Sequence, residues 1–192
     1  MTKWINFYRP FFASDEETKT FVKICEELAP DVTNHNAKIM MHQTQRLVLI
    51  ANDLSNIRPG REALQLLFLM ICVEHISKLH DGFAGEGQSK KYVKRFFAEF
   101  ITESAKDKLE KSFIDNSSTP MKALGLDKAV DLLYSVRCDV VHEGNYWGFS
   151  FHDGLTPMVN VDPDVNVYIT LRELRDIIVQ GCIRAIKDKL KP

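Results

Sequence analysis

Arg137 and His142 are the residues whose types could support chemistry, and both belong to the segment RCDVVHEG. A guanidinium keeps its positive charge at physiological pH and binds carboxylates and phosphates, whereas an imidazole gains or loses a proton near neutral pH. The two residue types therefore allow anion binding and proton transfer. Their spacing is awkward, because side chains five positions apart on an ideal helix point about 140° away from each other.

Arg137 interrupts the apolar face of a helix that we expect over about 126–142. On a helical wheel it lies one turn from Leu133 and one turn from Val141, inside an apolar arc. It therefore points toward the core, an interface or a cleft between helices. Burying a guanidinium without a partner is costly, so a carboxylate should compensate it. Glu74, at the end of the apolar run of an earlier helix, is the best candidate.

His142 stands in the last turn of the same expected helix, which Gly144 should end. A histidine at this position can cap the helix or interact favourably with its dipole. Alternatively, both His142 and Arg137 reach the edge of one cleft, because geometry loosens in a final turn and an arginine side chain is long.

The elements that must position these residues are mostly helical. Apolar periodicity and capping patterns predict helices over about 14–30, 33–54, 61–79, 89–113, 126–142 and 171–190. The third is apolar nearly all round and should be the central one. Residues 145–169 change to partial alternation and predict two or three short strands, including a hairpin. We therefore expect a single all-α domain over 1–192, with an aromatic N-terminal segment at 1–13 and a small β-hairpin insertion at 145–169 before the last helix.

The bulk composition excludes several classes. A net charge of −1 gives no overall attraction to nucleic acid. The four cysteines, Cys25, Cys72, Cys138 and Cys182, show no C-x-x-C spacing, so neither a zinc site nor a disulfide framework is indicated. The N-terminus lacks a signal-peptide pattern, and the longest apolar run is too short to span a bilayer. We expect a cytoplasmic protein without a membrane segment.

Two further groups have both a functional and a structural interpretation. His75 and His80 could suggest metal ligands, but their spacing does not place both rings on one helix face, and we predict no metal. A cluster of basic residues opens the helix at 89; its members are Lys90, Lys91, Lys94 and Arg95. They could follow an RNA backbone, or they could form the solvated face of an amphipathic helix.

The segment LLYSVRCDVVHEG resembles the R-x4–6-H signature of the HEPN superfamily, placed at the end of a late helix and before a glycine. The earlier segment LFLMICVEHISKL is similar to the core helix of that family, which often carries an acidic residue at about the place of Glu74. The resemblance covers about 35–145. The position after the arginine, which is polar in active members, is Cys138 here, and Asp139 follows it.

This resemblance implies a HEPN-like helical bundle and a metal-independent, cofactor-free endoribonuclease. His142 would act as general acid or base, and Arg137 would stabilise charge on the phosphoryl oxygens, with Glu74 and Asp139 in support. The RNA 2′-hydroxyl would attack and leave a 2′,3′-cyclic phosphate. It also implies a homodimer, and a role in phage defence, toxin–antitoxin pairs with a regulatory protein, or RNA turnover. The alternative is a non-catalytic HEPN-like module that binds a nucleotide, RNA or a protein partner.

Overall fold

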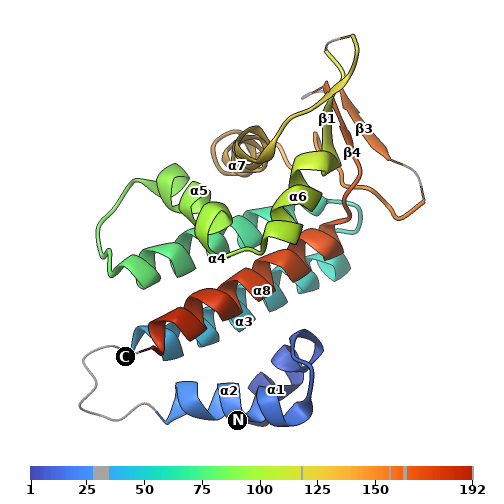
Figure 1. The fold of residues 1–192 in the computed structure, drawn as a ribbon. Coiled ribbons are helices and arrows are strands. Elements are labelled where there is room, and N and C mark those ends of the chain that lie inside the picture. The colour runs from blue at the N-terminus through green and yellow to red at the C-terminus, as the bar shows by residue number, and fades with distance from the viewer. Residues whose placement is uncertain (28–34, 118, 156, 162–163, 192) are drawn as a thin grey trace.

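The most apolar segment of the chain forms the central helix of the computed structural model. This helix, α4 (Glu62–Asp81), packs against α3 (Asn36–Ile57), α5 (Ser89–Glu99), α7 (Leu126–Glu143) and α8 (Leu171–Lys189) (Figure 1). A helix that is apolar nearly all round must be covered from several sides. The arrangement confirms the central position predicted from the sequence.

The structure describes residues 1–27, 35–117, 119–155, 157–161 and 164–191. The predicted helix end at Pro30 and the predicted helix start at Thr33 lie outside these residues. Helices α4, α7 and α8 lie within two residues of the predicted bounds. Thr170 and Glu173 form a capping box before α8.

The aromatic N-terminal segment is helical and packs on the body of the same chain. It consists of α1 (Thr2–Tyr8) and a 3₁₀ turn, Arg9–Phe11, and it precedes α2 (Asp15–Glu26). Tyr8 is fully buried and donates a hydrogen bond to the Met41 carbonyl oxygen at 2.7 Å. Together α1 and α2 form a layer against α3 and α8 (Figure 1).

The helix predicted over 89–113 is in fact two helices, α5 and α6 (Glu103–Ser112). Thr102 adopts an extended conformation, and its hydroxyl accepts a hydrogen bond from the Ala105 N–H. This side-chain cap starts a new helix. The prediction of one continuous helix was wrong because Phe100 and Ile101 are buried between the two helices and resemble helix-face residues in the sequence.

A small antiparallel sheet lies at one end of the bundle. The predicted hairpin is formed by β3 (Met158–Val161) and β4 (Asp164–Val167). Two strands that the sequence did not predict, β1 (Phe113–Asp115) and β2 (Lys122–Ala123), complete the order β2-β1-β4-β3. The insertion is therefore anchored to the chain that leaves α6.

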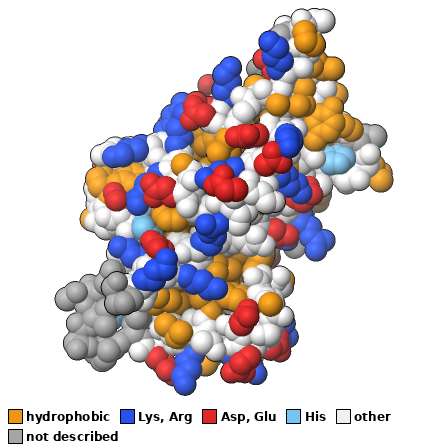
Figure 2. Space-filling model, viewed as in Figure 1, with side chains coloured by type: hydrophobic (Ala, Val, Ile, Leu, Met, Phe, Trp, Pro, Cys, Tyr) orange, Lys and Arg blue, Asp and Glu red, His pale blue; other side chains and the backbone are white. Residues whose placement is uncertain are grey.

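Helix α4 is also the one helix among the described residues that could span a membrane by length and composition. Four neighbouring helices pack against α4, as expected for a core helix. A core helix can have the same length and apolar composition as a membrane-spanning helix. On the face shown in Figure 2, acidic and basic side chains are interspersed, and hydrophobic side chains gather over the sheet and between α8 and α2. This face carries no region of one charge sign.

Candidate functional site

Arg137 projects from α7 toward α4, where it meets the carboxylate predicted for it. Its Nη2 lies 3.8 Å from Oε2 of Glu74, and the two side chains are 18% and 14% exposed. The guanidinium carbon also lies 5.7 Å from the centre of the Tyr134 ring. A separation of 3.8 Å permits Coulombic attraction but is too long for a hydrogen bond.

Glu74 has closer partners than Arg137. Its Oε1 accepts hydrogen bonds from Lys78 Nζ and from the Ser89 hydroxyl, both at 2.7 Å. Lys78 lies one turn further along α4, and Ser89 is the first residue of α5. The carboxylate is therefore fixed through one oxygen, while the other oxygen faces Arg137.

The guanidinium of Arg137 consequently keeps its hydrogen-bond donors free. It makes no hydrogen bond with any described residue. A few polar side-chain atoms of the described residues are fully buried without a hydrogen-bond partner, but none of them is a nitrogen atom of Arg137. Those nitrogen atoms therefore reach solvent. A cation held in place by Glu74 but not saturated by it is suited to bind a further anion, such as a phosphoryl group.

His142 lies in the last turn of α7 and is exposed. Gly144 ends this helix with φ +66°, a conformation that favours glycine, which confirms the predicted stop. Since α7 is a regular helix up to Glu143, His142 and Arg137 leave it about 140° apart and about 7.5 Å apart along its axis. Within one chain, the two side chains do not converge on a single point.

The other residues near Arg137 are half-buried. Asp139 is fixed through its backbone, because its carbonyl oxygen accepts the Asn145 N–H at 3.1 Å. Burial raises the pKa of the Tyr134 hydroxyl, and the neighbouring Cys138 acts in the same direction. Tyr134 is therefore a neutral donor beside Arg137 at physiological pH.

The apolar arc drawn from the sequence was slightly misplaced. Val136 is 4% exposed and belongs to the core, whereas Val141 is 48% exposed. The face that packs on α4 and α5 is thus rotated away from Val141. Arg137 lies beside Val136 at the edge of that face, which explains why its guanidinium reaches solvent.

The basic residues of α5 are paired with acidic residues. Lys90 lies 3.0 Å from Asp131, and Lys94 lies 2.8 Å from Asp127 and 3.0 Å from Asp131. The hydrogen bonds that Lys94 donates to Asp127 and Asp131 raise the pKa of its ammonium group. Lys91 donates to the Gln88 side chain at 3.1 Å. The positive potential available to RNA here is smaller than the sequence indicates.

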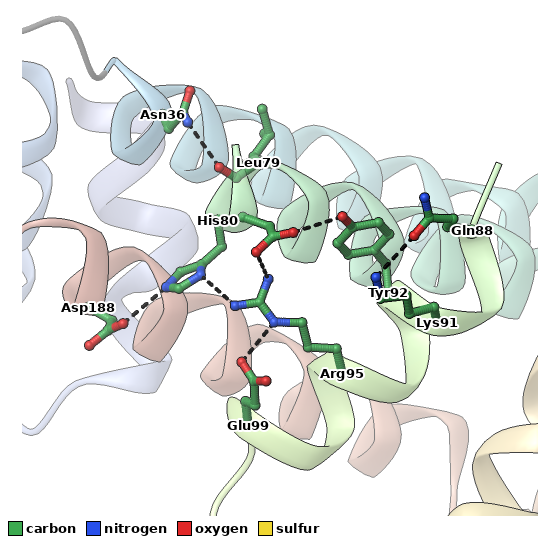
Figure 3. A network of polar contacts seen from close by, with 10 residues as sticks. Asn36, Leu79, His80, Gln88, Lys91, Tyr92, Arg95, Glu99 and Asp188 are labelled. Carbon is green, nitrogen blue, oxygen red and sulfur yellow. Dashed lines mark hydrogen bonds and ion pairs between the residues drawn. The ribbon is translucent and has the colours of Figure 1, made fainter. Parts of the chain in front are cut away.

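Arg95, the last of these basic residues, is part of an extended polar network (Figure 3). Its guanidinium lies 2.9 Å from Asp81 and 2.8 Å from Glu99, and its Nη2 approaches His80 Nδ1 at 3.4 Å. The other ring nitrogen of His80 lies 3.0 Å from Asp188 near the end of α8. The network joins α4, α5 and α8, and the only sequence signal for it was the i,i+4 spacing of Arg95 and Glu99.

His75 and His80 have separate environments. His75 is half-buried, and burial lowers its pKa, whereas His80 belongs to the network of Figure 3. Within the described parts of the chain, no three histidine, cysteine, aspartate or glutamate side chains are grouped so that they could hold a metal ion. All four cysteines are free thiols.

Comparison of the chain with protein-family models, with curated proteins and with solved structures gave no match. The geometry around Arg137 is therefore the basis for assigning a function.

Proposed function

We propose that this protein is a metal-independent endoribonuclease of HEPN type that acts as a homodimer in the cytoplasm. The observation that supports the proposal is the environment of Arg137. This guanidinium is largely buried and held beside Glu74, yet it keeps free donors that reach solvent. Such an arrangement suits stabilisation of charge that develops on a phosphoryl group.

In the proposed reaction, the 2′-hydroxyl of RNA attacks the adjacent phosphorus, and the bond to the 5′-oxygen of the next nucleotide breaks. His142 takes the proton from the 2′-hydroxyl or gives one to the departing 5′-oxygen. Arg137 stabilises the negative charge on the non-bridging oxygens. The products are a 2′,3′-cyclic phosphate and a 5′-hydroxyl, so the reaction consumes no water and requires no metal ion.

A homodimer would resolve the divergence of Arg137 and His142 on α7. In a twofold arrangement with α7 at the interface, the arginine of one chain and the histidine of the other can face the same phosphate. Trp4 and Tyr8 of the aromatic N-terminal segment are buried in their own chain, so they do not contribute to such an interface. The exposed side chain of Val141, beside His142, offers apolar surface at the proposed interface.

The test is RNA cleavage in the presence of EDTA by the full chain, with product ends analysed by mass spectrometry. We expect cleavage that survives chelation and leaves cyclic-phosphate ends, and its loss in His142→Ala. His35→Ala is the matched control, because His35 is another exposed histidine at a helix end. Activity retained in His142→Ala, or lost on chelation, would contradict the proposal.

A second candidate is a non-catalytic HEPN-like module that binds RNA, a nucleotide or a protein. The observation that favours it is the separation of His142 from Arg137 within one chain. RNA binding without cleavage, together with a monomer in sedimentation at micromolar concentration, would support this module. For the ribonuclease, we infer a role in phage defence, in a toxin–antitoxin pair or in RNA turnover.

A further inference from the structure

A groove between α3, α8 and the N-terminal segment lies apart from Arg137. Two adjoining hollows form it, of about 390 Å³ and about 180 Å³, and both are lined by Asn52, Arg172 and Arg175. In Figure 1, this is the region where the 3₁₀ turn after α1 meets the first half of α8. The two hollows share these three lining residues and therefore lie next to each other.

The two arginines of the groove are in different states. Arg175 is held in place, because its Nε and Nη2 donate to Asp176 at 3.0 and 2.8 Å and its Nη1 donates to Asn52 at 3.3 Å. Arg172 is exposed and makes no hydrogen bond or ion pair with any described residue. Since the two residues are three positions apart on α8, their side chains share one face of the helix.

The two carboxylates of the groove make no hydrogen bond or ion pair with Arg172. Asp176 is engaged by Arg175, and Glu62, in the smaller hollow, accepts the Phe151 N–H at 2.6 Å. The groove therefore presents one guanidinium that has no carboxylate partner among the described residues, next to a second that is fixed in orientation. Two neighbouring guanidiniums suit a carboxylate or phosphate.

Apolar side chains also line the larger hollow. Phe7, Pro10, Phe11 and Val48 line it, and the two phenylalanine rings lie 6.3 Å apart at an angle of 44°. This wall can contact a flat ring while the arginines hold an anionic group. The size of the larger hollow also falls in the range of small-molecule sites.

From these contacts we infer that the groove binds a small organic anion that carries a planar ring, with the anionic group between Arg172 and Arg175 and the ring against Phe7 and Phe11. A nucleoside monophosphate and an aromatic carboxylate both have this chemistry. The inference does not rest on the proposed ribonuclease activity.

The experiment is calorimetric titration of the full chain with adenosine 5′-monophosphate and, separately, with 2-naphthoate. Adenosine and inorganic phosphate serve as ring-only and anion-only probes. We expect at least one of the two complete ligands to bind at least about 10-fold more tightly than either partial probe. Tighter binding of the nucleotide identifies phosphate as the anion, and tighter binding of 2-naphthoate identifies carboxylate.

Arg172→Gln should weaken that binding by at least about 10-fold, whereas Arg184→Gln, which removes another exposed arginine of α8, should leave it unchanged. Because Arg172 is exposed and pairs with no described residue, the variant should fold normally, which a melting curve checks. Equal binding to the Arg172→Gln variant, or no binding of either complete ligand up to about 1 mM, would overturn the inference.

Discussion

Arg95 and Arg137 are buried to a similar extent, with side chains 22% and 18% exposed, but their partners differ. Arg95 has two carboxylates within 2.9 Å and a histidine ring nitrogen at 3.4 Å. Among the described residues, Arg137 has one carboxylate partner, Glu74, at 3.8 Å. Burial alone therefore does not distinguish a structural arginine from one that is available to a ligand. The number of close carboxylate and hydrogen-bond partners makes this distinction between Arg95 and Arg137.

The difference arises from how each carboxylate is shared. Asp81 and Glu99 both lie close to Arg95, whereas Glu74 directs one oxygen to Lys78 and Ser89 and only the other toward Arg137. Lys78 thus satisfies Glu74 and leaves Arg137 under-coordinated. This contrast orders the expected effects of substitution on stability.

The largest effect should come from Glu74→Gln. This change removes the charge that lies between Lys78 and Arg137, whose side chains are 16% and 18% exposed. Two poorly solvated cations then face each other, and we expect the free energy of unfolding to fall by about 2–3 kcal/mol in urea titration. Glu86→Gln is the control, because Glu86 is exposed and makes no hydrogen bond or ion pair with a described residue. A loss no larger than in this control would show that Glu74 does not hold the two cations.

A smaller loss is expected for Arg95→Met, which keeps the apolar stem and removes the charge. Its partners Asp81 and Glu99 are 45% and 50% exposed, so water can solvate them after the change. We expect the free energy of unfolding to fall by about 1–2 kcal/mol in the same titration. If the protein is a ribonuclease, RNA cleavage should be normal. Cleavage lost in this variant at a temperature where it remains folded would assign Arg95 to the site.

The matched change Arg137→Met should lower the free energy of unfolding by less than about 1 kcal/mol, because Glu74 keeps Lys78 and Ser89 as partners. Cleavage should nevertheless be abolished. The contrast between Arg95 and Arg137 would be contradicted if Arg137→Met lowered the free energy of unfolding by about 3–5 kcal/mol and the added change Glu74→Gln reversed this loss. Arg137 would then be a structural partner of Glu74, and the main support for catalysis would be removed.

The sequence predicted α4, α7 and α8, the hairpin and the proximity of Arg137 and Glu74, because each depends on apolar periodicity or on the cost of an unpaired charge. The sequence did not indicate that α1 is helical or that α5 and α6 are separate helices. It did not predict β1 and β2, since strands of three and two residues carry no detectable alternation. It also missed the role of Lys78. A lysine one turn after a glutamate is common on solvated helices, and only the packing of α5 brings Ser89 to the same carboxylate oxygen.

The smallest effect concerns pH and extends the comparison to the carboxylates. Asp81 lies beside Arg95 and accepts a hydrogen bond from the Tyr92 hydroxyl, and this bond is the main cause that lowers its pKa. Glu62 is half-buried, and burial raises its pKa, although the bond from the Phe151 N–H opposes the shift. The two carboxyl groups should therefore contribute to stability with opposite dependence on pH.

For Asp81 the folded protein binds its proton less tightly than the unfolded chain, so its contribution is present above the ordinary aspartate pKa of about 3.9 and is lost as pH falls through the lowered value. For Glu62 the folded protein binds the proton more tightly, so stability falls as pH rises from about 4.3 through the raised value. Urea titrations of the wild type, Glu62→Gln and Asp81→Asn at a series of pH values measure both. Relative to the wild type, Glu62→Gln should gain stability as pH rises through its window, because the glutamine cannot become charged and its side-chain oxygen can still accept the Phe151 N–H. As pH falls, Asp81→Asn should lose less stability than the wild type. The wild-type carboxylate loses its charge by protonation, whereas the asparagine has no charge to lose. If both variants changed in the same direction with pH, the Tyr92 hydrogen bond to Asp81 and the burial of Glu62 would not be what separates the two carboxylates.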